Sequence, residues 1–359
     1  MSRTGRAVIA HGQDFDIREY AVPDPNPDTL LVRQELGGIC GTDLHMWQNG
    51  IPGEMLLGHE NVGIIDKLGA DVTTDYVGNP VREGDRIIFA PGTASGAYGF
   101  QSDPDTGPHF RGGFADYIHL CLPNTLFIKT DLEPEVAVMT EPFTIGVHAV
   151  MRGGIEIGDT VVVQGSGAIG LVTLVCAKIS GAAKIIMVGG PAGRLDLAKR
   201  MGADVTVNIE DVASVEERTE IVRSHTPRSA GANVVFECAG FLSAIPEGLG
   251  YTKYGGTFVE VGAGAQHSCG LKTDATIVCW GDNGSGQTAP PAGLVPLGPL
   301  PSIGDHSCDG VDDDCDGETD EDCPQIDPGC GAVDFQDNAA EMVVANMPTS
   351  YEAVTYELW

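Results

Sequence analysis

The pattern of hydrophobic and polar positions changes character near residue 150. In the first 150 residues, short apolar and β-branched runs alternate with clusters of turn residues. The five clearest runs lie at 7–10, 30–33, 62–65, 86–90 and 114–120. Short strands bounded by Gly, Pro, Asn and Asp are typical of a compact, mostly β domain, and we expect one over residues 1–150.

From residue 157 the apolar runs alternate with segments of helical period. Strands are predicted at 160–164, 184–188, 204–208, 233–238 and 256–261, and helices at 168–180, 193–201, 213–224 and 242–249. Strands that alternate with helices predict a doubly wound parallel sheet, here over residues 151–262. The expected fold class is therefore α/β, with a separate β-rich domain in front of the parallel sheet.

A glycine-rich motif lies between the first predicted strand of this sheet and its helix. Gly165, Gly167 and Gly170 have the spacing of a dinucleotide fingerprint, in which glycines let the backbone approach a pyrophosphate at a helix N-terminus. Because the motif has the strand and the helix that it needs on either side, we predict a dinucleotide cofactor. Gly189 occupies the position where an acidic residue would bind the adenosine ribose. No acid there enforces NAD and no adjacent Arg favours NADP, so both cofactors remain open.

The last 97 residues differ from the rest in charge and cysteine content. The 359-residue chain carries 51 acidic and 20 basic residues, for a formal charge of −31. Residues 263–359 hold 18 of the acidic residues and one basic residue, Lys272, and contribute −17, whereas the first 262 residues contribute −14. Six of the ten cysteines also lie in this part. The asymmetry indicates a composite chain with an acidic tail.

The tail divides into four segments by composition. Residues 263–287 have the pattern of a β-hairpin, 288–307 form a Pro/Gly linker, 308–330 are rich in Cys and Asp, and 331–359 close the chain. Four carboxylates in the third segment stand at positions 1, 3, 5 and 9 of a calcium loop: Asp312, Asp314, Asp316 and Asp320. Position 12 is Cys323 rather than Glu, so calcium binding would be of modest affinity, and a solvated acidic run is the alternative.

Charge and hydropathy exclude several classes of function. A strongly acidic chain repels phosphate backbones, so we expect neither nucleic-acid nor anionic-membrane binding. The longest nearly apolar run, 168–177, is far shorter than the ~20 residues that span a bilayer. The N-terminal residues have no signal-peptide pattern, which favours the cytoplasm, although the tail's composition suits an extracellular setting.

Three short segments of the first domain contain residues that bind metals. They are 38–45, which includes Cys40, 58–63, which includes His59, and 141–143, which begins with Glu141. Cys, His and Glu are ligands that zinc accepts, and three protein ligands with one open position define a catalytic zinc site. Each residue alone is more often a core or surface residue, so the signal lies in the order of the three segments. Together with the glycine motif they resemble the zinc-dependent medium-chain alcohol and polyol dehydrogenases, over about residues 6–262.

The resemblance implies roles for individual residues. It implies a GroES-like catalytic domain in which Cys40, His59 and Glu141 hold one zinc ion and Glu60 is an exchangeable or supporting ligand. It implies that Thr42 and His45 relay a proton from the alcohol toward solvent. The implied reaction is hydride transfer between a secondary alcohol or polyol and NAD or NADP, because a zinc-bound alcohol loses its proton near neutral pH.

Two features of that family are not recognisable. No Cys occurs between Cys40 and Cys121, so we expect no structural zinc and regard His109 as an ordinary loop residue. The sixth strand of the sheet, which commonly forms the dimer interface, and the segment that returns to the catalytic domain are not evident either. Residues 338–346 have helical periodicity and could be a remnant of these missing elements. A homo-oligomer is therefore compatible with the sequence but lacks its usual interface strand.

Two other readings follow from the tail. Residues 263–287 resemble one repeat of the regulator-of-chromosome-condensation type of propeller, and 308–323 are similar to Cys/Asp-rich metal-binding repeats of secreted bacterial proteins. The chain could therefore be a non-catalytic calcium-binding or surface interaction protein. It could also be an inactive chimera in which a truncated dehydrogenase is joined to a foreign tail near residue 262.

Overall fold

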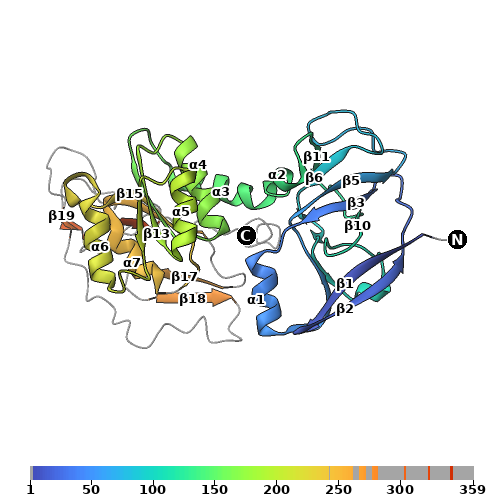
Figure 1. Ribbon diagram of the computed structural model, residues 1–359, viewed down its shortest axis with the longest axis horizontal. Coiled ribbons are helices and arrows are strands. Elements are labelled where there is room, and N and C mark those ends of the chain that lie inside the picture. Colours follow the sequence, from blue (N-terminus) through green and yellow to red (C-terminus); the bar gives the residue numbers. More distant parts are fainter. Residues whose placement is uncertain are drawn as a thin grey trace. The chain divides into compact units, whose positions relative to one another are not determined.

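The computed structural model describes residues 3–241 and 243–261 in full, and five short strands beyond residue 261 by their backbone (Figure 1). The described residues divide into two compact units that meet in sequence between Thr144 and Ile145. Among the described helices, none combines the length and the apolar composition needed to cross a bilayer.

The first unit contains two antiparallel sheets, as the run of short apolar segments predicted. One sheet has the order β2 (Asp14–Ala21), β1 (Thr4–Gly12), β4 (Ile51–Leu57) and β9 (Phe100–Ser102). The other has the order β10 (Tyr117–Leu120), β3 (Leu30–Gly37), β5 (Asn61–Leu68), β6 (Arg86–Phe89) and β11 (Phe127–Lys129). The smaller elements are α1 (Gly41–Asn49), the hairpin of β7 (Gly92–Thr93) and β8 (Gly96–Ala97), η1 (Pro104–Thr106) and α2 (Pro134–Ala137).

Neighbouring strands of the five-stranded sheet contribute apolar side chains to a core of the first unit. Leu30, Val32, Ile65 and Ile118 are at most 3 % exposed and pack into one apolar cluster. Burying each such side chain stabilises the fold by about 1.5–3 kcal/mol, so this cluster fixes the strands from which the loops of the candidate site start.

The second unit is a parallel sheet with helices between its strands. α3 (Thr140–Gly153) leads into it, and the sheet has the order β14 (Val205–Asn208), β13 (Lys184–Gly189), β12 (Thr160–Gln164), β15 (Ala232–Glu237), β16 (Thr252–Glu260) and β21 (Ala340–Met342). The connecting helices are α4 (Ala168–Ile179), α5 (Ala192–Met201), α6 (Val215–Ser224), η2 (Pro227–Ser229) and α7 (Ala244–Tyr251). In Figure 1, α4 and α5 lie on one side of this sheet and α6 and α7 on the other. The prediction of a doubly wound α/β sheet is confirmed.

The sixth strand differs from the expectation for that stretch of sequence. All five strands recognised in the sequence form, and Ala340–Met342 adds a parallel strand beside β16, with Gly256 opposite Ala340. The expectation of a helix is therefore wrong for these three residues. The outer edge of β16 offers unpaired N–H and C=O groups, and their pairing outweighs the weak helical period of a short segment.

Little of the tail falls within the described residues. β17 (His267–Leu271) and β18 (Ile277–Gly281) form the expected antiparallel hairpin, with Cys269 opposite Cys279. β19 (Ile303–Gly304) pairs with β20 (Asp322–Cys323). The four carboxylates of the predicted calcium loop, Asp312, Asp314, Asp316 and Asp320, lie outside the described residues.

Candidate functional site

Cys40 is positioned by the start of the first helix. It is the N-cap of α1: its Sγ accepts a hydrogen bond of 3.4 Å from the N–H of Thr42, and its own N–H donates to Asp43 Oδ2 at 2.9 Å. This reciprocal pair is a capping box, which satisfies N–H groups that the first turn of a helix leaves without partners. The local fold therefore holds the sulfur at one place.

His59 and Glu60 form the turn between β4 and β5. His59 is fully buried, and the backbone approaches Glu60 so closely that a Cβ on Gly38 would lie 2.0 Å from Glu60 Oε2. The ligand atoms of Cys40, His59 and Glu60 all lie within 4.8 Å of one another. A thiol, an imidazole and a carboxylate gathered at this distance are a donor set that fits zinc.

A carboxylate stands behind the histidine. Asp43 is 3 % exposed, and its Oδ1 lies 3.7 Å from His59 Nδ1. The ring of His59 also stacks on Phe100, with 5.2 Å between the centroids. A carboxylate that faces one nitrogen of a metal-binding His fixes the ring and raises its basicity. Asp43 had no predicted role, although an acidic residue three positions after a helix cap is a sequence signal for a capping box.

Burial disfavours the charged form of every titratable group in this cluster. It raises the pKa of Cys40 to about 11, of Glu141 to about 8 and of Asp43 to about 6, and it lowers the pKa of His59 to about 4. The pKa of Glu60 is also raised, first by burial and then by the charge of Asp43. A bound divalent cation would reverse these preferences, because it favours the thiolate, the carboxylates and the neutral imidazole.

Glu141 lies near the cluster but outside the group of three ligand atoms. It is in the first turn of α3, and the charges of Glu60 and Asp43 add to burial in raising its pKa. The structure thus places the carboxylate of Glu60, rather than that of Glu141, within 4.8 Å of the Cys40 and His59 ligand atoms.

The two residues expected to relay a proton share one face of α1. Thr42 is half-buried beside Cys40, and His45, three residues later, is exposed. Residues three apart in a helix lie one above the other, so the pair leads from the cluster toward solvent.

Hydrogen bonds and ring stacking hold the loop after β6. Tyr20 donates a hydrogen bond of 2.6 Å to Asp105, and Arg18 donates to the same carboxylate at 3.0 Å. His109 stacks on Tyr20 at 4.5 Å, and its Nδ1 is hydrogen-bonded to the carbonyl oxygen of Pro104. His109 is therefore occupied within its own loop.

In the second unit, the glycine motif turns tightly between β12 and α4. Gly165 has φ +105°, and a Cβ there would lie 2.7 Å from the backbone of Cys238 and Ala239. A Cβ on Gly170 would lie only 1.8 Å from the carbonyl oxygen of Gly165. Around a Cβ on Gly167, the N-cap of α4, no described atom lies within 4 Å. Two of the glycines are thus required by the turn, and the third leaves open space where a pyrophosphate would approach the helix N-terminus.

Ser166 fills the space beside Gly189, the position at which an acidic residue would bind the adenosine ribose. Its Oγ donates to the carbonyl oxygen of Gly190 at 2.8 Å and accepts from the N–H of Gly190 at 3.1 Å. A Cβ on Gly189, the last residue of β13, would lie 2.6 Å from this oxygen. Position 189 therefore has no room for an acidic side chain. This constraint comes from a contact between two loops, so the sequence alone does not reveal it.

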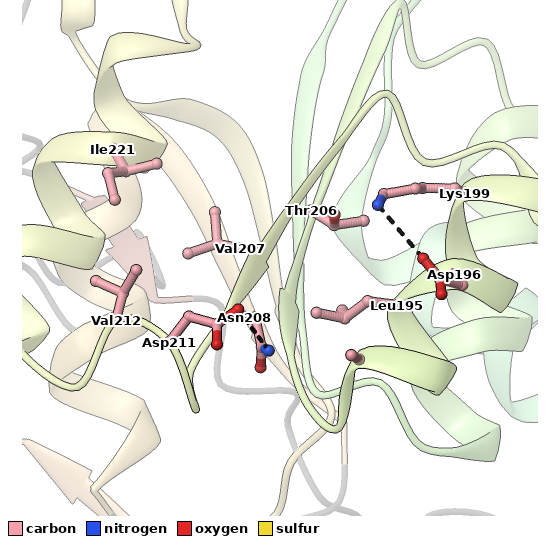
Figure 2. A pocket seen from close by; sticks show the side chains of 10 residues that line it. Leu195, Asp196, Lys199, Thr206, Val207, Asn208, Asp211, Val212 and Ile221 are labelled. Atoms are coloured by element: carbon pink, nitrogen blue, oxygen red, sulfur yellow. Dashed lines mark hydrogen bonds and ion pairs between the residues drawn. The ribbon is translucent and has the colours of Figure 1, made fainter.

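A cavity of about 370 Å³ lies elsewhere in this unit, between α5, β14 and α6 (Figure 2). Its lining includes Lys199 and Asp196, which form an ion pair of 3.5 Å, and Asn208 and Asp211, which share a hydrogen bond of 2.9 Å. None of the four glycines assigned to the dinucleotide lines this cavity.

Family models match both units of the chain. The model of the alcohol dehydrogenase GroES-like domain matches residues 26–130, and the model of the zinc-binding dehydrogenase matches residues 168–279. The second match runs past residue 262 to residue 279, so it covers β17 and the first part of β18. No comparison supports the likeness of this segment to a propeller repeat.

Curated relatives and solved structures agree with these models. The chain is 35 % identical to 5-exo-hydroxycamphor dehydrogenase of Pseudomonas putida, over 71 % of this chain and 75 % of that protein. It is 32 % identical to human sorbitol dehydrogenase, with 72 % and 75 % covered. An alcohol dehydrogenase structure from Thermotoga maritima superposes with a TM-score of 0.65 at 27 % identity, covering 72 % of this chain and 77 % of that one.

Another similar solved structure contains a bound cofactor. A Sinorhizobium meliloti protein described as a zinc-binding dehydrogenase and bound to NADP has a TM-score of 0.61 at 29 % identity, with 73 % of this chain and 77 % of that one covered. Both family models, the relatives and the cluster of Cys40, His59 and Glu60, which we call the metal-type cluster, point to the same family. The chain belongs to the family of zinc-dependent alcohol and polyol dehydrogenases, enzymes that transfer a hydride between an alcohol and NAD(P).

Proposed function

We propose that this chain oxidises a secondary alcohol or polyol, with zinc held by Cys40, His59 and a carboxylate of Glu60 or Glu141. The observation that carries the proposal is the group of three ligand atoms within 4.8 Å of one another. The two curated relatives described above are named for hydroxycamphor and sorbitol, which supports an alcohol as the substrate.

Zinc, when bound, would lower the pKa of the substrate hydroxyl, and the nicotinamide would accept the hydride. The chain's own residues prepare this step. Asp43 orients His59 from 3.7 Å, and the α1 cap holds the Cys40 sulfur. Thr42 would accept the proton of the substrate hydroxyl as its own hydroxyl proton passes to the His45 imidazole, which would then release a proton to solvent; the two residues share the face of α1 that leads outward.

The second unit would hold the dinucleotide. We assign the pyrophosphate to the N-terminus of α4, at the open face of Gly167. Ser166 blocks an acid at position 189, so the carboxylate that commonly selects NAD cannot stand there. We therefore propose that the chain accepts both NAD and NADP.

The test uses the full chain, assayed for zinc by mass spectrometry and for reduction of NAD⁺ and NADP⁺ with a panel of cyclic alcohols and polyols. We expect bound zinc and alcohol-dependent reduction of either cofactor. Cys40→Ser should lose both the zinc and the activity. Cys121→Ser is the matched control, because Cys121 is a half-buried cysteine of the same unit outside the cluster, and it should keep both. Full activity in Cys40→Ser would disprove the assignment.

A further inference from the structure

An exposed aromatic residue stands at the carboxyl edge of the parallel sheet. Phe241 follows the end of β15 by four residues and is 69 % exposed. β12 lies between β13, which comes next in the chain, and β15, which comes later, so the strand order reverses between β12 and β15. Ligands of open α/β sheets bind outside the carboxyl ends of the strands at such a switch point. Phe241 is therefore exposed at the place where this fold binds ligands.

The loop that carries Phe241 is fixed at both ends. Glu237, the last residue of β15, is 1 % exposed and accepts hydrogen bonds from the N–H groups of Ala239 at 2.6 Å and Gly240 at 3.0 Å. Gly240 has φ +72°, a conformation that suits glycine and directs the chain out of the turn. On the other side, the carbonyl oxygen of Phe241 accepts a hydrogen bond of 2.8 Å from Ala244, at the start of α7.

The same loop packs against the glycine motif. The space above Gly165 is filled by the backbone of Cys238 and Ala239, at 2.7 Å from an added Cβ. Phe241 is two residues beyond that contact, so its position relative to the expected pyrophosphate site is set by backbone rather than by flexible side chains.

The opposite edge of the sheet offers a comparison. Tyr254 is 76 % exposed and lies in the first part of β16, toward the amino ends of the parallel strands. Single exposed aromatic residues are common and need no ligand to explain them. What distinguishes Phe241 is the combination of exposure, a clamped loop and the carboxyl edge.

We propose that Phe241 is the stacking platform for the adenine ring of the dinucleotide, and that Glu237 positions it. The proposal rests on the proposed function, because it concerns the same cofactor. Ser166 excludes a ribose-binding carboxylate at position 189, so the adenosine half must gain affinity from another contact. Stacking on an aromatic side chain supplies such affinity without contacting the ribose hydroxyls, and so does not discriminate between NAD and NADP.

The experiment measures equilibrium binding by calorimetry on the full chain, with 5′-AMP, nicotinamide mononucleotide and NAD⁺ as probes. Phe241→Ala should weaken 5′-AMP and NAD⁺ about tenfold and leave nicotinamide mononucleotide unchanged, since stacking is worth about 1–3 kcal/mol per base. Phe241→Trp should retain 5′-AMP affinity and gain fluorescence that 5′-AMP quenches. The matched control, Tyr254→Ala, removes an equally exposed aromatic from the other edge and should bind all three probes as the wild type does.

Unchanged 5′-AMP affinity in Phe241→Ala, or no added quenching in Phe241→Trp, would overturn the proposal while leaving the dehydrogenase assignment intact. Equal losses of 5′-AMP and nicotinamide mononucleotide would also overturn it, because they would indicate a collapsed loop rather than a lost base contact. Failure of the wild-type chain to bind NAD⁺, NADP⁺ or 5′-AMP would instead contradict the proposed function itself.

Discussion

The two candidate sites, one in each unit, are built in opposite ways. The first gathers the titratable side chains of Cys40, His59 and Glu60, and burial disfavours the charged form of all three. The second is made of backbone. Gly165 and Gly170 lie so close to neighbouring backbone atoms that neither position has space for a side chain. We therefore expect the side chains of the first site to take their metal-binding forms only around a cation, whereas the second site has no space for a side chain at Gly165 or Gly170. Removing an ion should affect the first, and adding a methyl group should affect the second.

The largest effect should come from Gly170→Ala, which tests the backbone site. The added Cβ would lie 1.8 Å from the carbonyl oxygen of Gly165, so the turn must move. We expect loss of measurable dinucleotide binding by calorimetry and a free energy of unfolding about 2 kcal/mol lower, the usual scale of overpacking. Zinc content should not change, because the metal-type cluster belongs to the other unit.

Gly167→Ala is the control for this substitution. Its Cβ would meet no described atom within 4 Å, and its φ of −74° suits any residue. The variant should melt as the wild type does and bind the dinucleotide more weakly, because the methyl group occupies the space assigned to the pyrophosphate. If Gly170→Ala bound the cofactor normally, the turn would not be the binding site.

The contrast also explains how much could be predicted from the sequence. Regular alternation of apolar strands and amphipathic helices gave the parallel sheet to within a few residues, as at β14, predicted at 204–208 and found at Val205–Asn208. Cys40, His59 and the glycines could be predicted as site residues because they lie in short, ordered motifs. Asp43, Ser166 and Phe241 were missed, because their roles depend on contacts between loops that are distant in sequence or on one edge of the sheet.

The sequence also could not predict which carboxylate lies beside Cys40 and His59, or that β21 is the last strand of the parallel sheet. Sequence order could not decide whether Glu60 or Glu141 approaches Cys40 and His59, since that depends on how the β4–β5 turn and α3 are placed. The strand Ala340–Met342 is three residues long, too short for a period to be detected, and is selected by the free edge of β16.

An intermediate effect is expected for Thr42→Ala, which separates proton transfer from metal and cofactor binding. Loss of the hydroxyl should lower kcat about a hundredfold, the scale of a positioned acid–base group. Zinc content should persist, because Thr42→Ala keeps the backbone N–H that bonds to the Cys40 sulfur and removes only the hydroxyl that also bonds to it, and the dinucleotide Kd should not change. Steady-state kinetics and mass spectrometry measure these quantities. Thr42→Ser should restore most of kcat, and a variant that raised only KM would argue against a relay.

The smallest effect should appear in the stability of the metal-free protein. Burial and the charges of Glu60 and Asp43 raise the pKa of Glu141 from its ordinary 4.5 to about 8. Between these values the folded state keeps a proton that the unfolded state has released, so this group's contribution is fully present below pH 4.5 and is lost as pH rises to 8. Thermal unfolding of chelator-treated protein should therefore show a Tm that falls by a few degrees from pH 5.5 to pH 8. Zinc should remove this fall, because it binds the deprotonated carboxylate.

Glu141→Gln keeps the size of the side chain but cannot titrate, so it should flatten most of the fall. Glu54→Gln is the matched control: Arg18 holds the pKa of Glu54 below its ordinary value, so that group is already ionised in both states across this range and the fall should persist. The Tm of the metal-free protein could instead rise with pH, or fall equally in Glu141→Gln and in the wild type. Either result would mean that burial and the charges of Glu60 and Asp43 do not raise the pKa of Glu141. The contrast between a charge-dependent site and a backbone site would then rest on Cys40 and His59 alone.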